Sequence, residues 1–199
     1  KTKNGGMFKY YTTFAFSDLG LRRPDIDSNY LKDAFTLKNR NWYNNLSYRE
    51  NIGDGWKMTL GASFSTNLDN IQQQVQDNNN QPKQFSSSVY WMNSKNFTLD
   101  NLQNLALGRA VFEKKLGGLS VLRFGSEYWH TTYKPKYNDS LFKQTDNYTA
   151  AFTEASIYLS KELAAQVGTR FEHSSLIDKS DIAPRASLAY KTGKNSQVS

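Results

Sequence analysis

The chain has 199 residues, of which 38% are hydrophobic and 22% charged, with a formal net charge of +7 and no cysteine. It contains no apolar run near the roughly 18 residues that a membrane-spanning helix needs, and the lack of cysteine excludes disulfides and thiolate zinc sites. The 14% aromatic residues, with only four prolines, exclude a disordered chain.

The positive charge by itself permits nucleic-acid binding. However, lysine and arginine are spread along the whole sequence and form neither a basic run nor a basic motif that bears aromatic residues. We therefore expect no nucleic-acid partner.

Both ends of the chain predict turns that lead to further strands. Asn4-Gly5 favours a tight hairpin turn, and TGKN at 192–195 turns the chain toward a ninth strand that has barely begun. The sequence also starts without methionine or a signal peptide. We expect residues 1–199 to be a fragment of a longer barrel domain.

The first three predicted strands lie near 7–17, 35–50 and 56–66, and each has one apolar face because apolar residues recur at every second position. The residues that share a parity are Phe8, Tyr10, Phe14 and Phe16, then Trp42, Leu46 and Tyr48, then Trp56, Met58, Leu60, Ala62 and Phe64. The third strand spans roughly 26 Å, or about 20 Å when tilted, which approaches the apolar band of an outer-membrane barrel. Trp56 and Phe64 are expected at its two interfaces.

The connections between these strands predict loops of unequal length. We expect a long polar loop at 19–33, a short turn at 51–55, and a long external loop at 67–104 with a short strand extension near 89–92. Alternation then restarts and predicts strands near 104–115 and 119–133, joined by a turn at 116–119 and followed by a loop at 134–147.

The last three predicted strands, near 148–160, 164–174 and 182–191, separate charge from apolar residues most clearly. One parity carries charged residues of both signs, and the other carries small and aromatic apolar residues. Lipid outside and a polar lumen inside produce this pattern. The predicted fold class is all-β: an antiparallel up-and-down meander of about eight strands, part of a transmembrane outer-membrane β-barrel, with short and long connections in strict alternation.

A fragment of a wide barrel has two free edges. Strands shaped for a wide barrel need a different shear to close at eight, so we expect an open sheet or one completed by another chain. A complete eight-stranded barrel with a structural or adhesion role is the alternative.

Several segments resemble one family in serial order. AAFTEASIYLSKELAAQVGTRFEHSSL and IAPRASLAYKTGKNSQVS look like the barrel of TonB-dependent outer-membrane receptors, especially those of Bacteroidetes type, and GGMFKYYTTFAF and LKNRNWYNNLSYRENIGDGWKMTLGASFS are similar to earlier hairpins of such barrels. The resemblance implies a barrel of about 22 strands, closed by a plug, that takes up a ligand across the bacterial outer membrane with energy relayed by TonB. The implied partners are outer-membrane lipid, the plug domain, TonB and an unknown small ligand: a siderophore, vitamin, glycan or peptide. Neither the plug nor the TonB-contacting segment lies within this sequence.

Charged residues on the predicted strands are candidates to face the lumen and contact a plug or ligand path. They are Arg109, Glu113, Arg123, Glu127, Glu154, Arg170, Glu172 and Arg185. Pairing of opposite charges across neighbouring strands is the favoured structural explanation for them.

Aromatic residues of the predicted external loops are candidates to bind the ligand. They are Tyr90, Trp91, Trp129, Tyr133 and Tyr137. For Trp129, at a strand end, a place in the aromatic girdle at the membrane interface is favoured instead.

An outer-membrane lipolytic enzyme is the remaining alternative, because His173 and Ser175 lie two residues apart on a predicted strand. No residue is placed to orient such a histidine, so we expect no catalytic activity. His130 is the only other histidine, and no spacing predicts a metal site or another cofactor.

Overall fold

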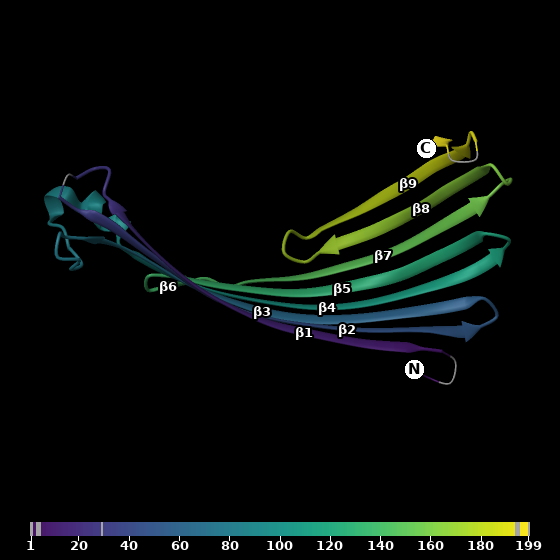
Figure 1. Cartoon of the computed structure of the whole chain (residues 1–199), viewed down its shortest axis with the longest axis horizontal. Helices are drawn as coiled ribbons and strands as arrows, with labels where there is room; N and C mark the ends of the chain where they lie inside the picture. Colours follow the sequence, from purple (N-terminus) through teal and green to yellow (C-terminus); the bar gives the residue numbers. More distant parts are fainter. Residues whose placement is uncertain (1, 3–4, 29, 194–195, 199) are drawn as a thin grey trace.

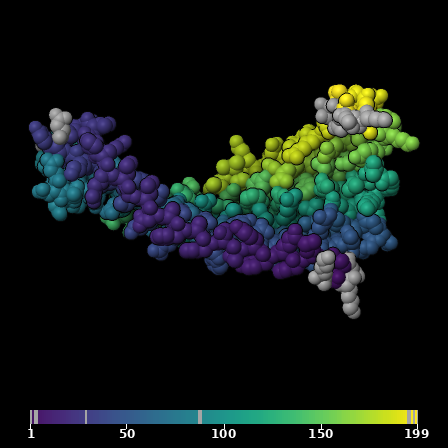
Figure 2. All heavy atoms as spheres, in the orientation of Figure 1, coloured from purple at the N-terminus to yellow at the C-terminus, as the bar shows by residue number. Residues whose placement is uncertain are grey.

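The computed structural model describes residues 2, 5–28, 30–193 and 196–198. They form one curved antiparallel sheet, drawn in Figure 1, and Figure 2 shows it as a single bowed layer. The strands are β1 (Met7–Pro24), β2 (Lys32–Gly53), β3 (Trp56–Gln76), β4 (Phe97–Gly117), β5 (Ser120–Tyr137), β6 (Ser140–Leu141), β7 (Gln144–Tyr158), β8 (Leu163–Ser174), β9 (Lys179–Lys191) and β10 (Gln197–Val198). One 3-10 helix, η1 (Ser87–Lys95), lies between β3 and β4.

The strand order is a meander. Each long strand pairs antiparallel with the long strands next to it in sequence. The two-residue strands β6 and β10 pair with the ends of β5 and β9. This confirms the predicted all-β fold of eight principal strands. In the part of the chain that the structure describes, β1 and β9 do not pair, so the sheet is open as expected. No helix formed by these residues is long and apolar enough to cross a membrane.

The strands are much longer than predicted, which corrects the expected loops. Strands take up about half of 19–33 and of 67–104 and most of 134–147, and the connections between the long strands shrink to 25–31, 77–96 and 138–143. The predicted strand extension at 89–92 is wrong, because η1 occupies it. The connection at 175–178 is as short as the turn at 159–162, so loop lengths do not alternate strictly in the last hairpins.

Water on both faces explains why the strand extensions were missed. A strand of 21 residues such as β3, tilted by about 35°, rises roughly 55 Å, about twice the 25 Å apolar band of an outer-membrane barrel. Beyond the band neither face needs apolar side chains, so the period of two disappears from the sequence. The backbone pairing continues, since Gln72 still pairs with Thr98 and Thr36.

The register shows that the strands are tilted. One row of paired residues runs from Met58 through Phe112, Phe124, Thr153 and Thr169. The strands that leave the short turns begin two, four and six residues from this row, at Trp56, Ser120 and Leu163. A stagger of two residues per hairpin, about 6.6 Å along the strands for about 9.6 Å across them, corresponds to a tilt of about 35°, which matches barrel strands.

The short turns rely on backbone conformations that glycine favours. Gly53 and Gly55 have φ of 97° and 74°, and Gly117 and Gly118 have φ of 143° and 54°. The turns predicted around Asn4 and at 194–195 involve residues outside the described ranges.

Candidate functional site: the concave face and the external cap

The register separates two chemically different faces of the sheet. In the half of the sheet nearer the short turns, the convex face carries the apolar parity, with aromatic contacts between neighbouring strands: Phe112 stacks on Phe124 with ring centroids 5.6 Å apart, and Trp42 meets Phe64 edge-on at 6.2 Å. Many apolar side chains of this face are exposed in the isolated sheet; Phe14 of β1, for example, is 68% exposed. An apolar surface of this extent requires a nonaqueous environment, which lipid provides.

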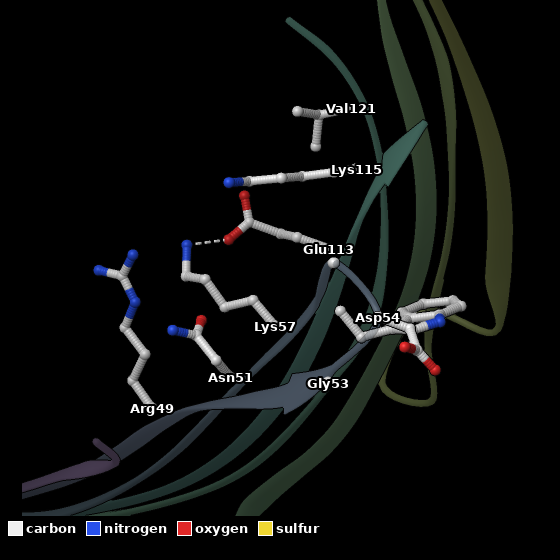
Figure 3. Close-up of a pocket in the computed structure, with 10 residues that line it drawn as sticks. Arg49, Asn51, Gly53, Asp54, Lys57, Glu113, Lys115 and Val121 are labelled. Carbon is white, nitrogen blue, oxygen red and sulfur yellow. Dashed lines mark hydrogen bonds and ion pairs between the residues drawn. The ribbon is translucent and has the colours of Figure 1, made fainter. Parts of the chain in front are cut away.

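The opposite face is concave and holds all eight charged candidates. Pairing places Arg109 opposite Glu127, Glu113 opposite Arg123, and Arg123 opposite Glu154. Glu172 and Arg170 lie on the same face of β8, and Arg185 lies on that face of β9. Figure 3 shows Glu113 among side chains that point into the hollow of the curved sheet.

Two ion-pair networks organise these charges. In the first, Glu113 pairs with Lys57 and with Arg123 (2.8 Å), and Arg123 also contacts Glu154 at 3.3 Å. Lys57, Glu113, Arg123 and Glu154 occupy one row of paired residues, so charge alternates from strand to strand.

The second network lies two to four residues farther from the short turns along the strands. Glu127 forms an ion pair with Arg109 at 3.1 Å and accepts a hydrogen bond from Arg170 at 3.0 Å, and Arg170 also pairs with Glu172. The Arg109 guanidinium lies 5.9 Å from the centre of the Phe152 ring. Arg185 makes no ion pair with any described residue. Cross-strand ion pairs therefore account for six of the eight candidates, and Glu172 pairs with Arg170 within β8.

The outer half of the concave face carries an amide cluster that the sequence did not reveal. Asp69 accepts hydrogen bonds from Asn39 (2.5 Å), Asn67 (2.9 Å) and Asn101 (3.4 Å), and Asn67 in turn accepts from Asn39. Asparagine is typical of loops, so the sequence predicted a loop for most of these positions. Only the pairing of β2, β3 and β4 brings them together.

The external cap, defined as residues 25–31, η1 and the adjoining ends of β2 and β3, contains the main buried core. Leu31, Val75 and Met92 are buried together, with Phe85 packed against them. Lys95 of η1 donates to Asp25 at 2.6 Å and also pairs with Asp27. The cap is a small packed unit because these contacts join two loops that are distant in sequence.

Asp25 and Asp33, two neighbouring carboxyl groups of the cap, have pKa values shifted in opposite directions. Burial raises the pKa of Asp33, and the adjacent Asp25 raises it further. For Asp25, burial acts in the same direction, but hydrogen bonds from Lys95 and from the Asp27 amide outweigh it, and its pKa is lowered. Because a raised folded pKa means that ionisation opposes folding, Asp33 loses its contribution to stability as pH rises through its folded pKa. Asp25 loses its own as pH falls through its lowered pKa.

The structure divides the aromatic candidates between two regions. Tyr90 and Trp91 lie on η1 in the external cap and are 73% and 48% exposed, with the Lys95 ammonium 5.9 Å from the centre of the Trp91 ring. Trp129, Tyr133 and Tyr137 all belong to β5 and not to an external loop, so the predicted loop at 134–147 is wrong for Tyr137.

Trp129 also does not lie in a lipid-facing girdle. It shares the concave face with Glu127 and meets Tyr148 edge-on at 6.4 Å. Its indole nitrogen is buried without a described hydrogen-bond partner. The girdle interpretation fails because its parity is that of the charged residues.

The histidines do not form a catalytic arrangement in the part of the chain that is described. His173 contacts the hydroxyl of Ser180 at 3.0 Å, whereas Ser175 hydrogen-bonds to Asp146 and the Asn147 amide. No carboxylate among the described residues hydrogen-bonds to the other nitrogen of His173. No group of acidic and histidine side chains among the described residues has the arrangement of a metal site.

An open sheet of long, tilted antiparallel strands, apolar on its convex face and charged on its concave face, is part of the wall of a transmembrane β-barrel. Residues 1–198 match the family described as TonB dependent receptor-like, beta-barrel, and the chain belongs to this family. Neither a search of curated proteins nor a search of solved structures finds a match. The family comprises outer-membrane receptors that transport ligands, and it is not a family of enzymes.

Proposed function

We propose that the chain supplies part of the barrel wall and of the external ligand-binding loops of an outer-membrane uptake receptor. The observation that carries this proposal is the separation of apolar side chains on the convex face from polar and charged side chains on the concave face, in the half of the sheet nearer the short turns. The convex face contacts lipid, and the concave face contacts the plug domain and the ligand path. Membership of the receptor family supports the same assignment.

The external cap is the proposed ligand-contacting part. Its buried core and the Lys95 ion pairs hold η1 in place, so Tyr90 and Trp91 project from a rigid support instead of a free loop. A rigid aromatic platform loses little conformational entropy when a ligand binds. The ligand classes to test are a siderophore, a vitamin, a glycan and a peptide, with uptake driven through TonB.

Cysteine labelling tests the location and orientation, because the chain has no cysteine of its own. Asn79→Cys places a thiol in the connection before η1, and Lys161→Cys places one in a short turn at the other end. In intact cells a membrane-impermeant maleimide should label the first variant alone, and permeabilised outer membranes should expose the second. Equal labelling in intact cells contradicts a spanning wall, and the opposite pattern contradicts the orientation.

Uptake measurements test the transport proposal. Cells that carry the intact protein are given labelled siderophore, vitamin, glycan and peptide probes, with and without TonB. One probe class should accumulate only when both the protein and TonB are present. Accumulation that is independent of TonB would contradict active uptake.

A further inference from the structure

One hollow of the concave face has an excess of positive charge. It has a volume of about 460 Å³ and lies at the short-turn end, lined by Arg49 of β2, Lys57 of β3, and Glu113 and Lys115 of β4. Figure 3 shows the cationic groups of Arg49, Lys57 and Lys115 pointing into this space, whereas Asp54 points away from it. Three cations thus face a single carboxylate.

That carboxylate is already engaged. Glu113 pairs with Lys57 and with Arg123 on the next strand, so it has little capacity left to neutralise other cations. Arg49 and Lys115 are exposed and make no ion pair with any residue in the described ranges. The two ion-pair networks are each neutral, so the excess charge of this hollow comes from Arg49 and Lys115.

The dimensions of the hollow favour a polypeptide over a small anion. Its cations come from three adjacent strands, whose backbones span about 10 Å, and the space is much larger than a single inorganic ion. A segment with carboxylates spaced 5–7 Å apart, as at alternate positions of a strand or on successive turns of a helix, meets this spacing. Val121 adds an apolar wall that a peptide can contact.

We propose that the hollow lined by Arg49, Lys57 and Lys115 is the docking surface for an acidic segment of the plug domain, with separate carboxylates facing Arg49 and Lys115. This inference rests on the proposed function, which places a plug against the concave face. It adds the chemistry of the plug surface at this end of the wall. Charges that are paired only on docking align the two parts and disfavour other registers.

Zero-length cross-linking of the intact protein in isolated outer membranes tests the proposal. A water-soluble carbodiimide activates a carboxyl group; the Lys115 amine attacks the activated carbon, an amide forms, and the carbodiimide leaves as a urea. Mass spectrometry of the digest should join Lys115 to an aspartate or glutamate of the plug. Lys115→Arg keeps the charge but should abolish the link.

A paired variant measures the contribution of the charges. Arg49→Gln combined with Lys115→Gln should lower the yield of a Lys57-to-plug link at least several-fold, because the acidic segment is held less firmly. Lys114→Gln is the control for the change on β4: it removes one positive charge next to Lys115, but Lys114 lies on the opposite face beside Trp56. Its cross-linking yield should equal that of the unaltered protein.

Several results would overturn the inference. These are a Lys115 link only to Glu113, a link to a different protein, no link at all, or equal yields in the paired variant and the control. Suppression of the link by millimolar phosphate, but not by chloride of equal ionic strength, would indicate a small-anion site and also overturns it. Cysteine labelling does not depend on this contact, so failure of the cross-link with correct labelling would refute the docking surface alone.

Discussion

Gly125 of β5 is the position where a single methyl group should disturb the wall most. A Cβ placed on Gly125 would lie 2.5 Å from the backbone oxygen of Ala110 and 2.8 Å from the ring of Phe152. The carbonyl belongs to the paired strand, so it moves only with the backbone of β4, and the Phe152 ring also has the Arg109 guanidinium 5.9 Å from its centre. Overpacking of this kind costs about 1–3 kcal/mol. We expect Gly125→Ala to reduce the free energy of unfolding by this amount.

Gly61 provides the matched control, because it lies on the same concave face of β3. A Cβ there has its nearest neighbours at 3.9 Å, and alanine restricts the unfolded chain, so Gly61→Ala should be neutral or slightly stabilising. Urea unfolding of the intact protein in lipid vesicles measures both variants. A Gly125→Ala free energy within about 0.5 kcal/mol of the Gly61→Ala value would refute the reasoning from Cβ contacts.

Three further changes test the charge networks and the external cap. Arg123→Gln should lower the free energy of unfolding by about 1 kcal/mol at low salt, because it leaves Glu113 and Glu154 facing each other at a partly exposed site. Arg185→Gln is the control, and it should change the free energy of unfolding in urea by less than about 0.5 kcal/mol. Asp33→Asn should increase the hydrogen-exchange protection of residues 26–28 and 30–31 at neutral pH, because it removes a carboxylate whose pKa is raised and whose ionisation opposes folding. In acid the protection should be unchanged, and equal effects at both pH values would contradict this reasoning. Trp91→Ala should weaken ligand binding to the intact protein at least several-fold in a direct titration without changing its thermal stability, and unchanged affinity would remove Trp91 from the site.

The sequence predicts the membrane-spanning half of this fold because lipid imposes a strict chemical alternation there. The alternation is direct in the segments 56–64 and 167–171, where the apolar residues, such as Trp56, Phe64 and Phe171, lie on the convex face. Water imposes no such constraint above the membrane. The outer halves of β3 and β4 therefore look like a loop, although Asn70 pairs with Asp100 as regularly as Met58 pairs with Phe112.

The charged candidates were found from parity alone, whereas their partners required the register. Nothing local shows that Arg170 reaches Glu127, 43 residues earlier in the chain and on a strand that is not its direct neighbour. Lys95 was missed for the same reason: its carboxylate partners lie about 70 residues away, and only the packing of η1 on the first connection brings them together. Trp129 is the opposite case: tryptophan is typical of a lipid-facing girdle, but Trp129 lies an even number of residues from Glu127 on β5 and therefore on the concave face.

Each successive hairpin is displaced by two residues along the strand direction, and this displacement sets the register in which any further strand must join the sheet. A hairpin added beside β9 in the same slope has to place its short turn about two residues farther along, and one added beside β1 about two residues back. Across the eight long strands the offset adds up to about eight residues, or roughly 26 Å. In a closed ring the same slope adds about one residue of offset per strand, so the shear of the complete barrel follows from the number of its strands.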